Sequence, residues 1–397
     1  MRMAGVVTGS RWMAIAGYSL VGAATQLVWL NFAGVTTVAA SRYGVSESAI
    51  GWLAQVFPLL YVVLAIPCGL ILDRWFRAGL IAGALLTAVG AGVRLIGDDF
   101  GWLLAGQIIA SVAQPLVLNA VTGITGRYLS PKDRPTGIAV GTASIFAGMV
   151  IAFLLSAVFT TAADLPIMLT VTAAFCVLAA LFLLFALRNQ GPFEVVRHGP
   201  VRGALRIAWG DSLIRRLCVL AIFPFGVFVA MSTFAQALLE PAGVSGGTAS
   251  TILLVNVVAG VVGSAVIPIL VVRRNAESAL LVVSLTVTAA ACTLLAFAPG
   301  VLVGFVAITL IGLLLLPALP IVLELVERRT GEAEGTAAGL IWMAGNLGGL
   351  VVAVVVGLLV DHPTAAFLVM AAIALIAVPG ARALRRPIAE LRAQSPL

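Results

Sequence analysis

The side chains that could bind a solute are amides and tryptophans inside long apolar runs. An amide surrounded by hydrocarbon needs a hydrogen-bond partner, so each either joins two helices or lines a polar cavity. Tryptophan ring faces attract organic cations. Both interpretations stay open for any single residue. Six candidates for substrate binding follow from this pattern: Gln26, Trp29, Gln114, Gln236, Trp342 and Asn346.

A second set of candidates is charged and suited to gating. Asp73, Arg74 and Arg77 follow the second apolar run. A carboxylate at a helix end beside arginines forms charge-assisted hydrogen bonds, which can hold one conformation and release in another. Glu324 lies about one turn inside the end of a later run and is a further gating candidate, or its carboxylate reaches out to water. The alternative for the Asp73 run is a basic loop that only fixes topology.

Several chemistries have no suitable residues. Both histidines, His198 and His362, fall between apolar runs, and the four cysteines lie in separate runs without a C-x-x-C pair. We therefore expect no haem, metal or other cofactor. The single lysine, Lys132, is not in a phosphate-binding loop, so we expect no ATP drive. We also expect no enzyme, because no nucleophile–base pair is evident inside a run. No carboxylate lies near the middle of a run, which favours facilitated diffusion or an uncharged or cationic solute.

The composition indicates what must position these residues. The chain has 397 residues, of which 61% are apolar and 10% are charged. Soluble domains carry about 25% charged residues. A membrane-spanning helix needs about 20 apolar residues, whereas the strands of a membrane barrel alternate polar and apolar. The sequence predicts twelve helical runs at roughly 12–40, 48–72, 78–96, 101–126, 135–160, 165–187, 213–239, 247–272, 278–297, 300–326, 335–360 and 364–381.

The positive charges predict the orientation. Of the 23 Lys and Arg residues, only Arg42 and Arg94 fall in connections on the outer side if the N-terminus is inside. Cytoplasmic loops retain positive charge. We therefore expect an integral protein of the plasma (inner) membrane with both termini cytoplasmic. The net charge of +7 is explained by topology, so nucleic acid is not an expected partner. Arg94 is expected to pair locally with Asp98.

The chain contains signs of an internal repeat. Gly106 and Gly304 are 198 residues apart, as are the motifs that begin at Gly137 and Gly335, each G-x-x-x-G. An offset of half the chain indicates two parallel repeats. We predict an all-α integral membrane protein in which twelve transmembrane helices form two six-helix bundles. The expected divisions are 1–190 for the N-terminal bundle, 191–210 for a cytoplasmic linker and 211–397 for the C-terminal bundle.

The segment Gly69–Arg77 resembles the loop signature of the major facilitator superfamily, G-x-x-x-D-[RK]-x-G-[RK]. The match includes Gly69, Asp73, Arg74 and Arg77, whereas Phe76 replaces the second glycine. The resemblance extends over essentially the whole chain. It implies twelve helices, two repeats and transport by alternating access.

Three segments are also similar to the branch of feline leukaemia virus subgroup C receptor-related transporters. They are Gly106–Gln114, Pro320–Glu327 and Glu332–Leu340. The resemblance implies movement of choline or ethanolamine and, in older proposals, haem. It also implies a pocket that combines glutamines with an aromatic cage.

The branch resemblance can be carried onto individual positions. Gln114 falls on the glutamine of helix 4, and Asn346 falls where helix 11 carries a second glutamine. Gln26 stands in place of the cage tryptophan, and Val229 stands in place of the cage tyrosine. The chain therefore departs from the branch at both cage positions.

Together these features predict a secondary active or facilitative transporter of a small organic solute, with amines and organic cations as the first class to test. The alternatives are a drug or metabolite efflux proton antiporter and a membrane receptor that does not transport. The expected partners are the solute and the lipid bilayer, and the chain is expected to be a monomer.

Overall fold

The computed structural model describes residues 9–32, 35–193, 203–330 and 334–394. Sixteen α-helices and one short 3₁₀ helix, η1 (Glu240–Ala242), lie in these ranges. The α-helices are α1 (Trp12–Leu30), α2 (Thr36–Tyr43), α3 (Glu47–Val93), α4 (Phe100–Leu118), α5 (Val121–Tyr128), α6 (Arg134–Val158), α7 (Leu165–Ala186), α8 (Ala204–Gly210), α9 (Ser212–Leu239), α10 (Gly246–Arg273), α11 (Glu277–Phe297), α12 (Val301–Leu315), α13 (Ala318–Thr330), α14 (Glu334–Gly357), α15 (Pro363–Ala383) and α16 (Arg385–Gln394).

Eleven helical segments in the described residues are long and apolar enough to cross a membrane. One of them belongs to α3, which has 47 residues. A helix of that length measures about 70 Å, more than twice the hydrocarbon thickness of a bilayer. The backbone of Trp75 is non-helical (φ −133°, ψ 57°) and divides α3 into two arms. The predicted runs 48–72 and 78–96 are these two arms, which explains why twelve predicted runs correspond to eleven segments.

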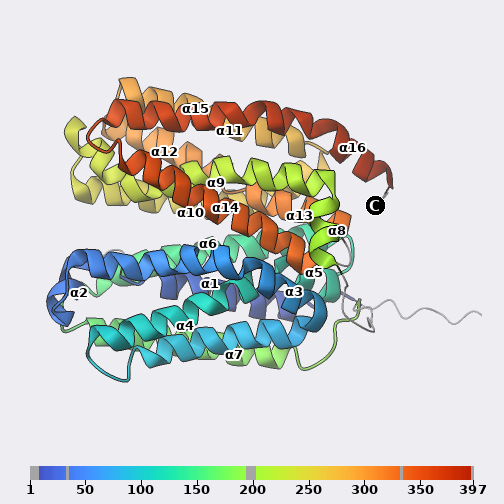
Figure 1. The fold of residues 1–397 in the computed structure, drawn as a ribbon, viewed down its shortest axis with the longest axis horizontal. Coiled ribbons are helices and arrows are strands. Elements are labelled where there is room, and N and C mark those ends of the chain that lie inside the picture. The colour runs from blue at the N-terminus through green and yellow to red at the C-terminus, as the bar shows by residue number, and fades with distance from the viewer. Residues whose placement is uncertain (1–8, 33–34, 194–202, 331–333, 395–397) are drawn as a thin grey trace, which may run out of the picture.

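The helices gather into two bundles (Figure 1). Helices α1 to α7 form one bundle, and α9 to α15 form the other. We call them the N-terminal and C-terminal bundles. They meet where α3 packs against α14 and where α6 packs against α10. The predicted linker 191–210 falls partly outside the described residues, and the exact domain boundaries remain a prediction.

Matching breaks in the two bundles agree with an internal repeat. In the N-terminal bundle α4 ends at Leu118 and α5 begins at Val121, and in the C-terminal bundle α12 ends at Leu315 and α13 begins at Ala318. Both ends of the break are therefore displaced by 197 residues, close to the 198 predicted from the glycines. Proline contributes to the break in α12–α13, because Pro317 cannot donate the helical hydrogen bond.

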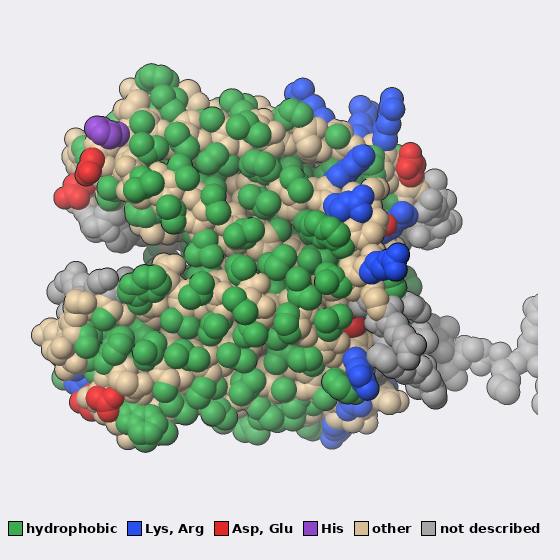
Figure 2. Space-filling view, viewed as in Figure 1, with side chains coloured by type: hydrophobic (Ala, Val, Ile, Leu, Met, Phe, Trp, Pro, Cys, Tyr) green, Lys and Arg blue, Asp and Glu red, His purple; other side chains and the backbone are tan. Residues whose placement is uncertain are grey.

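Local sequence explains where several helices begin. Ser46 caps α3 by accepting a hydrogen bond from the amide of Ala49 (3.1 Å), and Asp99 caps α4 by accepting from Trp102 (3.2 Å). Ser245 caps α10 in the same way. Such caps satisfy amides that have no partner inside the helix. Apolar side chains cover the middle of the molecular surface, as a bilayer requires (Figure 2).

Charge separates along the long axis of the molecule (Figure 2). Most visible arginines lie at one end, which we call the arginine-rich end, whereas a histidine lies at the opposite end and acidic side chains occur at both ends. The distribution agrees with the sequence-based expectation that positive charge is retained on one side of the membrane. A notch separates the two bundles at the end opposite to the arginines.

Candidate functional site

Asp73 joins the two bundles at the arginine-rich end. Its carboxylate accepts hydrogen bonds from the amides of Gly335 (2.7 Å) and Thr336 (3.1 Å) and from the hydroxyl of Thr336. Gly335 and Thr336 lie in the first turn of α14, where amides have no helical partner and the helix dipole favours negative charge. The buried Asp73 carboxylate therefore caps the first turn of α14, a helix of the other bundle. We call this contact the α3–α14 seam.

A glycine allows the backbones to come this close. Gly69 lies one turn before Asp73 on α3. A Cβ atom at Gly69 would lie 2.7 Å from the Cα of Thr336 and 2.8 Å from the carbonyl oxygen of Gly335. Both neighbours are backbone atoms, which cannot move aside as a flexible side chain can. The glycine and the aspartate of the G-x-x-x-D pattern therefore serve the same contact.

A second polar contact crosses the bundles nearby. Arg134, the first residue of α6, donates to Glu327 of α13 (2.8 Å). Sequence reasoning did not single out this pair. It named Glu324 instead, and the structure pairs Glu324 with Arg328 of its own helix (2.5 Å). Glu324 and Glu327 are three residues apart on α13, and hydropathy alone did not show which one faces α6.

Arg74 and Arg77 contact groups inside the N-terminal bundle. The guanidinium of Arg74 lies 4.2 Å from the ring centre of Trp75. Arg77 donates to the carbonyls of Leu187 and Arg188, which follow α7. Arg77 thus ties the second arm of α3 to the end of α7, beside the break at Trp75. The gating roles of Asp73, Arg74, Arg77 and Glu324 remain predictions.

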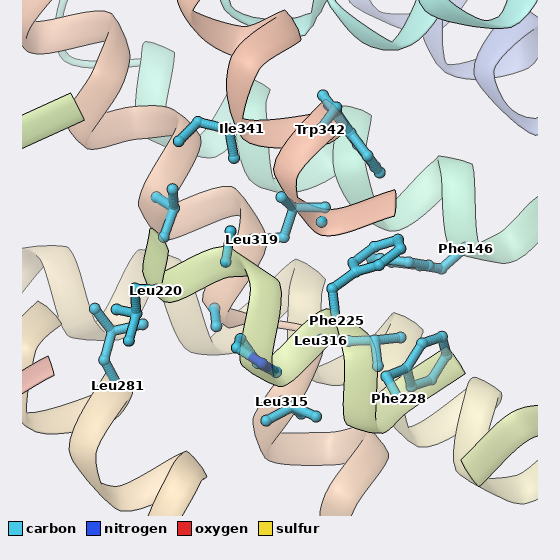
Figure 3. Close-up of a pocket in the computed structure, with 15 residues that line it drawn as sticks. Phe146, Leu220, Phe225, Phe228, Leu281, Leu315, Leu316, Leu319, Ile341 and Trp342 are labelled. Atoms are coloured by element: carbon cyan, nitrogen blue, oxygen red, sulfur yellow. The ribbon is translucent and has the colours of Figure 1, made fainter. Parts of the chain in front are cut away.

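An apolar cavity lies beside α14 in the C-terminal bundle (Figure 3). It contains about 580 Å³ of unoccupied space, part of which is continuous with solvent. Ring side chains in its wall are Phe225 and Phe228 of α9, Trp342 of α14 and Phe146 of α6. Phe146 comes from the N-terminal bundle, so both bundles contribute to this wall.

Of the six predicted binding residues, Trp342 lines this cavity. Its ring also lies 6.2 Å from that of Tyr61 in α3, measured between ring centres. Asn346 lies one turn further along α14 and donates to the carbonyl of Trp342 (2.9 Å). The side chain of Gln236 in α9 is outside the described residues.

The remaining three predicted residues lie in the N-terminal bundle. The indole of Trp29 donates to the carbonyl of Ala54 (2.7 Å) and so joins α1 to α3. Gln26 is buried and has one weak contact, with Thr25 (3.4 Å). The side chain of Gln114 is 4% exposed, and in the described part of the chain it makes no hydrogen bond. None of the three lines the cavity described above.

A buried polar network in the N-terminal bundle corrects one prediction. Arg94 does not pair with Asp98, because Arg42 takes that carboxylate (2.7 Å). Arg94 instead turns inward, where it is 1% exposed and donates to Asn31 (3.2 Å) and Gln107 (3.5 Å). Sequence proximity suggested the wrong partner because Arg42 comes from α2, a distant part of the chain.

The network also holds the end of α1. Gln107 donates to the carbonyls of Val28, Trp29 and Leu53, and Asn31 donates to the hydroxyl of Thr172 (3.1 Å). Carbonyls in the last turn of a helix have no helical partner, and a cation nearby complements the helix dipole. Arg94 and Gln107 therefore stabilise the break that follows Leu30. No group of three or more metal-ligating side chains occurs within the described ranges.

Comparison with known families agrees with this architecture. The model of the Major Facilitator Superfamily matches residues 7–353. The chain belongs to this superfamily.

Relatives within the superfamily have low identity but long overlap. Solute carrier family 49 member A3 of Danio rerio is 26% identical over 368 residues, covering 85% of this chain and 76% of the relative. The choline/ethanolamine transporter FLVCR2 of Homo sapiens is 24% identical over 386 residues, covering 90% and 73%. These matches agree with the resemblance seen in the sequence segments 106–114, 320–327 and 332–340.

Solved superfamily structures share the fold. The transporter FucP in its outward conformation superposes with a TM-score of 0.75 at 18% identity, over 94% of this chain and 99% of FucP. A bacterial homologue of the iron transporter ferroportin in an outward-facing state gives 0.76 at 16% identity, over 96% and 99%. At these identities the match shows the fold alone. The family and fold identify the chain as a membrane solute transporter.

Proposed function

We propose that this membrane solute transporter works by alternating access and carries a small organic solute between its two bundles. The observation that carries the proposal is the α3–α14 seam. Asp73 holds the first turn of α14 at the arginine-rich end, while a notch separates the bundles at the other end (Figure 2). Hydrogen bonds to a helix terminus break and form again without repacking a core, so they suit a contact that opens in each cycle.

The solute class rests on relatives and on side-chain chemistry. The human relative is named as a choline/ethanolamine transporter, which supports an amine or other organic cation. The sequence has no carboxylate near the middle of a predicted span, which is also compatible with an uncharged solute. We propose that Gln26, Trp29, Gln114, Gln236, Trp342 and Asn346 contact the solute at some stage of the cycle.

The proposal includes the cellular setting. We propose that the arginine-rich end faces the cytoplasm, with both termini there, and that the protein resides in the plasma membrane. Transport would need no ATP, no cofactor and no catalysis by the chain, which would act as a monomer.

The opening of the seam can be measured without knowing the solute. Ala65 on α3 is buried where α14 crosses it, next to Gly339. In a chain whose four free cysteines are replaced by alanine, an Ala65→Cys variant should react with an impermeant maleimide added on the arginine-rich side only when the seam opens. Asp73→Asn should raise the labelling rate several-fold, because hydrogen bonds to a charged group contribute about 1.5–3 kcal/mol. A rate unaffected by Asp73→Asn would contradict the proposed role of the seam.

A matched control uses the same helix. Ala91 is equally buried on the second arm of α3, where the neighbouring Gly90 packs against Gly106 and Ala110 of α4. Ala91→Cys should stay unreactive with or without Asp73→Asn. Labelling at both positions would indicate general unfolding instead of alternating access.

Flux across sealed proteoliposomes tests the solute-contacting residues. The panel should contain amines, amino alcohols and neutral metabolites. Gln114→Ala and Asn346→Ala should lower the transport of the accepted solute, and unchanged transport would remove the site assignment. Asp73→Asn should change turnover more than affinity, because the seam lies away from the solute.

A further inference from the structure

The cavity beside Trp342 has an unusually uniform wall. Its fifteen lining residues are aliphatic, aromatic, proline or glycine, and none carries a charge or an amide. The only polar side-chain atom among them is the indole nitrogen of Trp342, which is covered by its neighbours and without a partner in the described residues. A solute next to this wall therefore meets hydrocarbon and ring carbon (Figure 3).

Two glutamates of α13 near the wall, Glu324 and Glu327, are each paired with an arginine. Glu324 lies two residues beyond the lining residue Val322, and its carboxylate pairs with Arg328 (2.5 Å). Glu327 pairs with Arg134 across the bundles (2.8 Å). Neither glutamate lines the cavity. A cation that entered would lose its hydration and would not gain an opposite charge.

The aromatic rings of the wall pack on one another. Phe225 and Trp342 meet at a ring-centre distance of 6.1 Å and an interplanar angle of 82°. Phe146 and Phe228 meet at 6.4 Å and 66°. In an edge-to-face pair, one ring face is covered by the edge of its neighbour. A cage for a quaternary ammonium needs open ring faces directed at one point, so these pairs form a hydrophobic wall more readily than a cage.

We propose that the cavity selects an uncharged, largely apolar organic solute over a quaternary ammonium of the same shape. The inference rests on the transport function proposed above and narrows its solute class. The physical reason is that moving apolar surface from water to this wall is favourable. A charge that loses its hydration there gains no compensating interaction from the lining residues.

An isosteric pair of ligands isolates the charge. Choline and 3,3-dimethylbutan-1-ol have the same shape and hydroxyl, but the alcohol has carbon in place of the ammonium nitrogen. The full chain in detergent would be titrated with each, because a ligand of the folded state raises the unfolding midpoint. The alcohol should half-saturate at a concentration roughly tenfold or more below that of choline. Tighter or equal binding of choline, or no shift with the alcohol, would overturn the inference.

A wall substitution tests the mechanism of selection. Leu319 is only partly buried in the wall, so a longer polar side chain can be accommodated there. Leu319→Glu at pH 8 should move the preference toward choline by roughly tenfold or more, whereas Leu319→Gln should not. Equal behaviour of the two variants would overturn the inference. Ala221→Asp and Ala221→Asn repeat the comparison on α9 if the Leu319 variants do not fold.

Two controls separate this inference from the proposed function. Leu358→Glu places the same charge at an exposed position after α14, where it should leave the ligand preference unchanged. The Ala65→Cys labelling experiment reports on alternating access without any ligand. A chain that opens its seam but prefers choline refutes only the solute class, whereas a chain that never opens its seam refutes the transport mechanism.

Discussion

The Arg94 network of the N-terminal bundle and Asn256 of the C-terminal bundle differ in how their buried amides are hydrogen-bonded. In the network Asn31 and Gln107 have hydrogen-bond partners, including Arg94 and backbone carbonyls. In the C-terminal bundle Asn256 is equally buried, yet neither its nitrogen nor its oxygen has a partner among the described residues. Unpartnered hydroxyls occur in both bundles. Two equally buried asparagines, Asn31 and Asn256, therefore differ in hydrogen bonding and can be compared directly.

The largest expected effect comes from removing matched amides. Asn31→Ala and Asn256→Ala delete the same side chain at positions of equal burial, so the cavity terms are similar. Asn31→Ala also removes one hydrogen-bond partner from Arg94 and one from Thr172, and should cost about 1–2 kcal/mol more. The free energy of unfolding in mixed micelles measures both. Equal losses would show that the N-terminal network adds no stability.

A charge substitution sharpens the same comparison. Asn31→Asp should be tolerated much better than Asn31→Ala, because the carboxylate supplies the counter-charge that Arg94 lacks in the described network. Breaking a buried charged contact is costly, whereas completing one is not. Unfolding midpoints of the two variants at neutral pH show which one is more stable. An Asp variant less stable than the Ala variant would contradict this account of Arg94.

Buried threonines give a smaller effect. The hydroxyl of Thr172 accepts from Asn31 and donates to the carbonyl of Met168 (2.8 Å), whereas the hydroxyl of Thr288 has no partner in the described residues. Thr172→Val should cost about 0.5–1.5 kcal/mol, the typical net contribution of one intramolecular hydrogen bond. Thr288→Val should be neutral or stabilising, because it removes an unpaired polar atom. The reverse order in thermal unfolding would break the comparison.

The smallest expected effect concerns the rim of the C-terminal bundle. Burial alone would raise the pKa of Asp211, but a hydrogen bond from Arg329 and amides of Ile214 and Leu213 bring the pKa below its ordinary value. A lowered pKa means that stability is present at neutral pH and is lost as pH falls below about 3.9. Asp211→Asn should flatten that acid limb of the stability curve. A curve of unchanged steepness would show that Asp211 does not contribute.

Much of the architecture could be predicted from sequence, because the bilayer imposes strong rules on segment length and charge. The loop signature singled out Asp73, which the structure places one turn after Gly69 and against the first turn of α14, whereas its gating role remains a prediction. The prediction could not resolve α3, whose two arms are continuous but for Trp75. The hydropathy pattern of α3 predicts two separate runs, whereas its backbone angles show one helix interrupted at Trp75.

Side-chain partners were harder to predict for a physical reason. Arg94 is four residues from Asp98, but the carboxylate is held by Arg42 from another helix. Glu327 crosses to the other bundle, whereas Glu324 stays with its own helix. Which face of a helix meets which neighbour depends on packing between distant segments, and one sequence does not encode that visibly. The same reason leaves Gln26, Trp29 and Gln114 outside the cavity that Trp342 lines.

The use of main-chain amides by Asp73 has an evolutionary consequence. Two of the donors described above belong to the peptide groups of Gly335 and Thr336, which exist whatever side chain stands there. Apart from proline, no replacement at either position deletes the donor itself. Sequence drift on the α14 side is then limited by the space available, whereas on the α3 side it is limited by chemistry. Related chains should accordingly vary more freely at position 336 than at position 73.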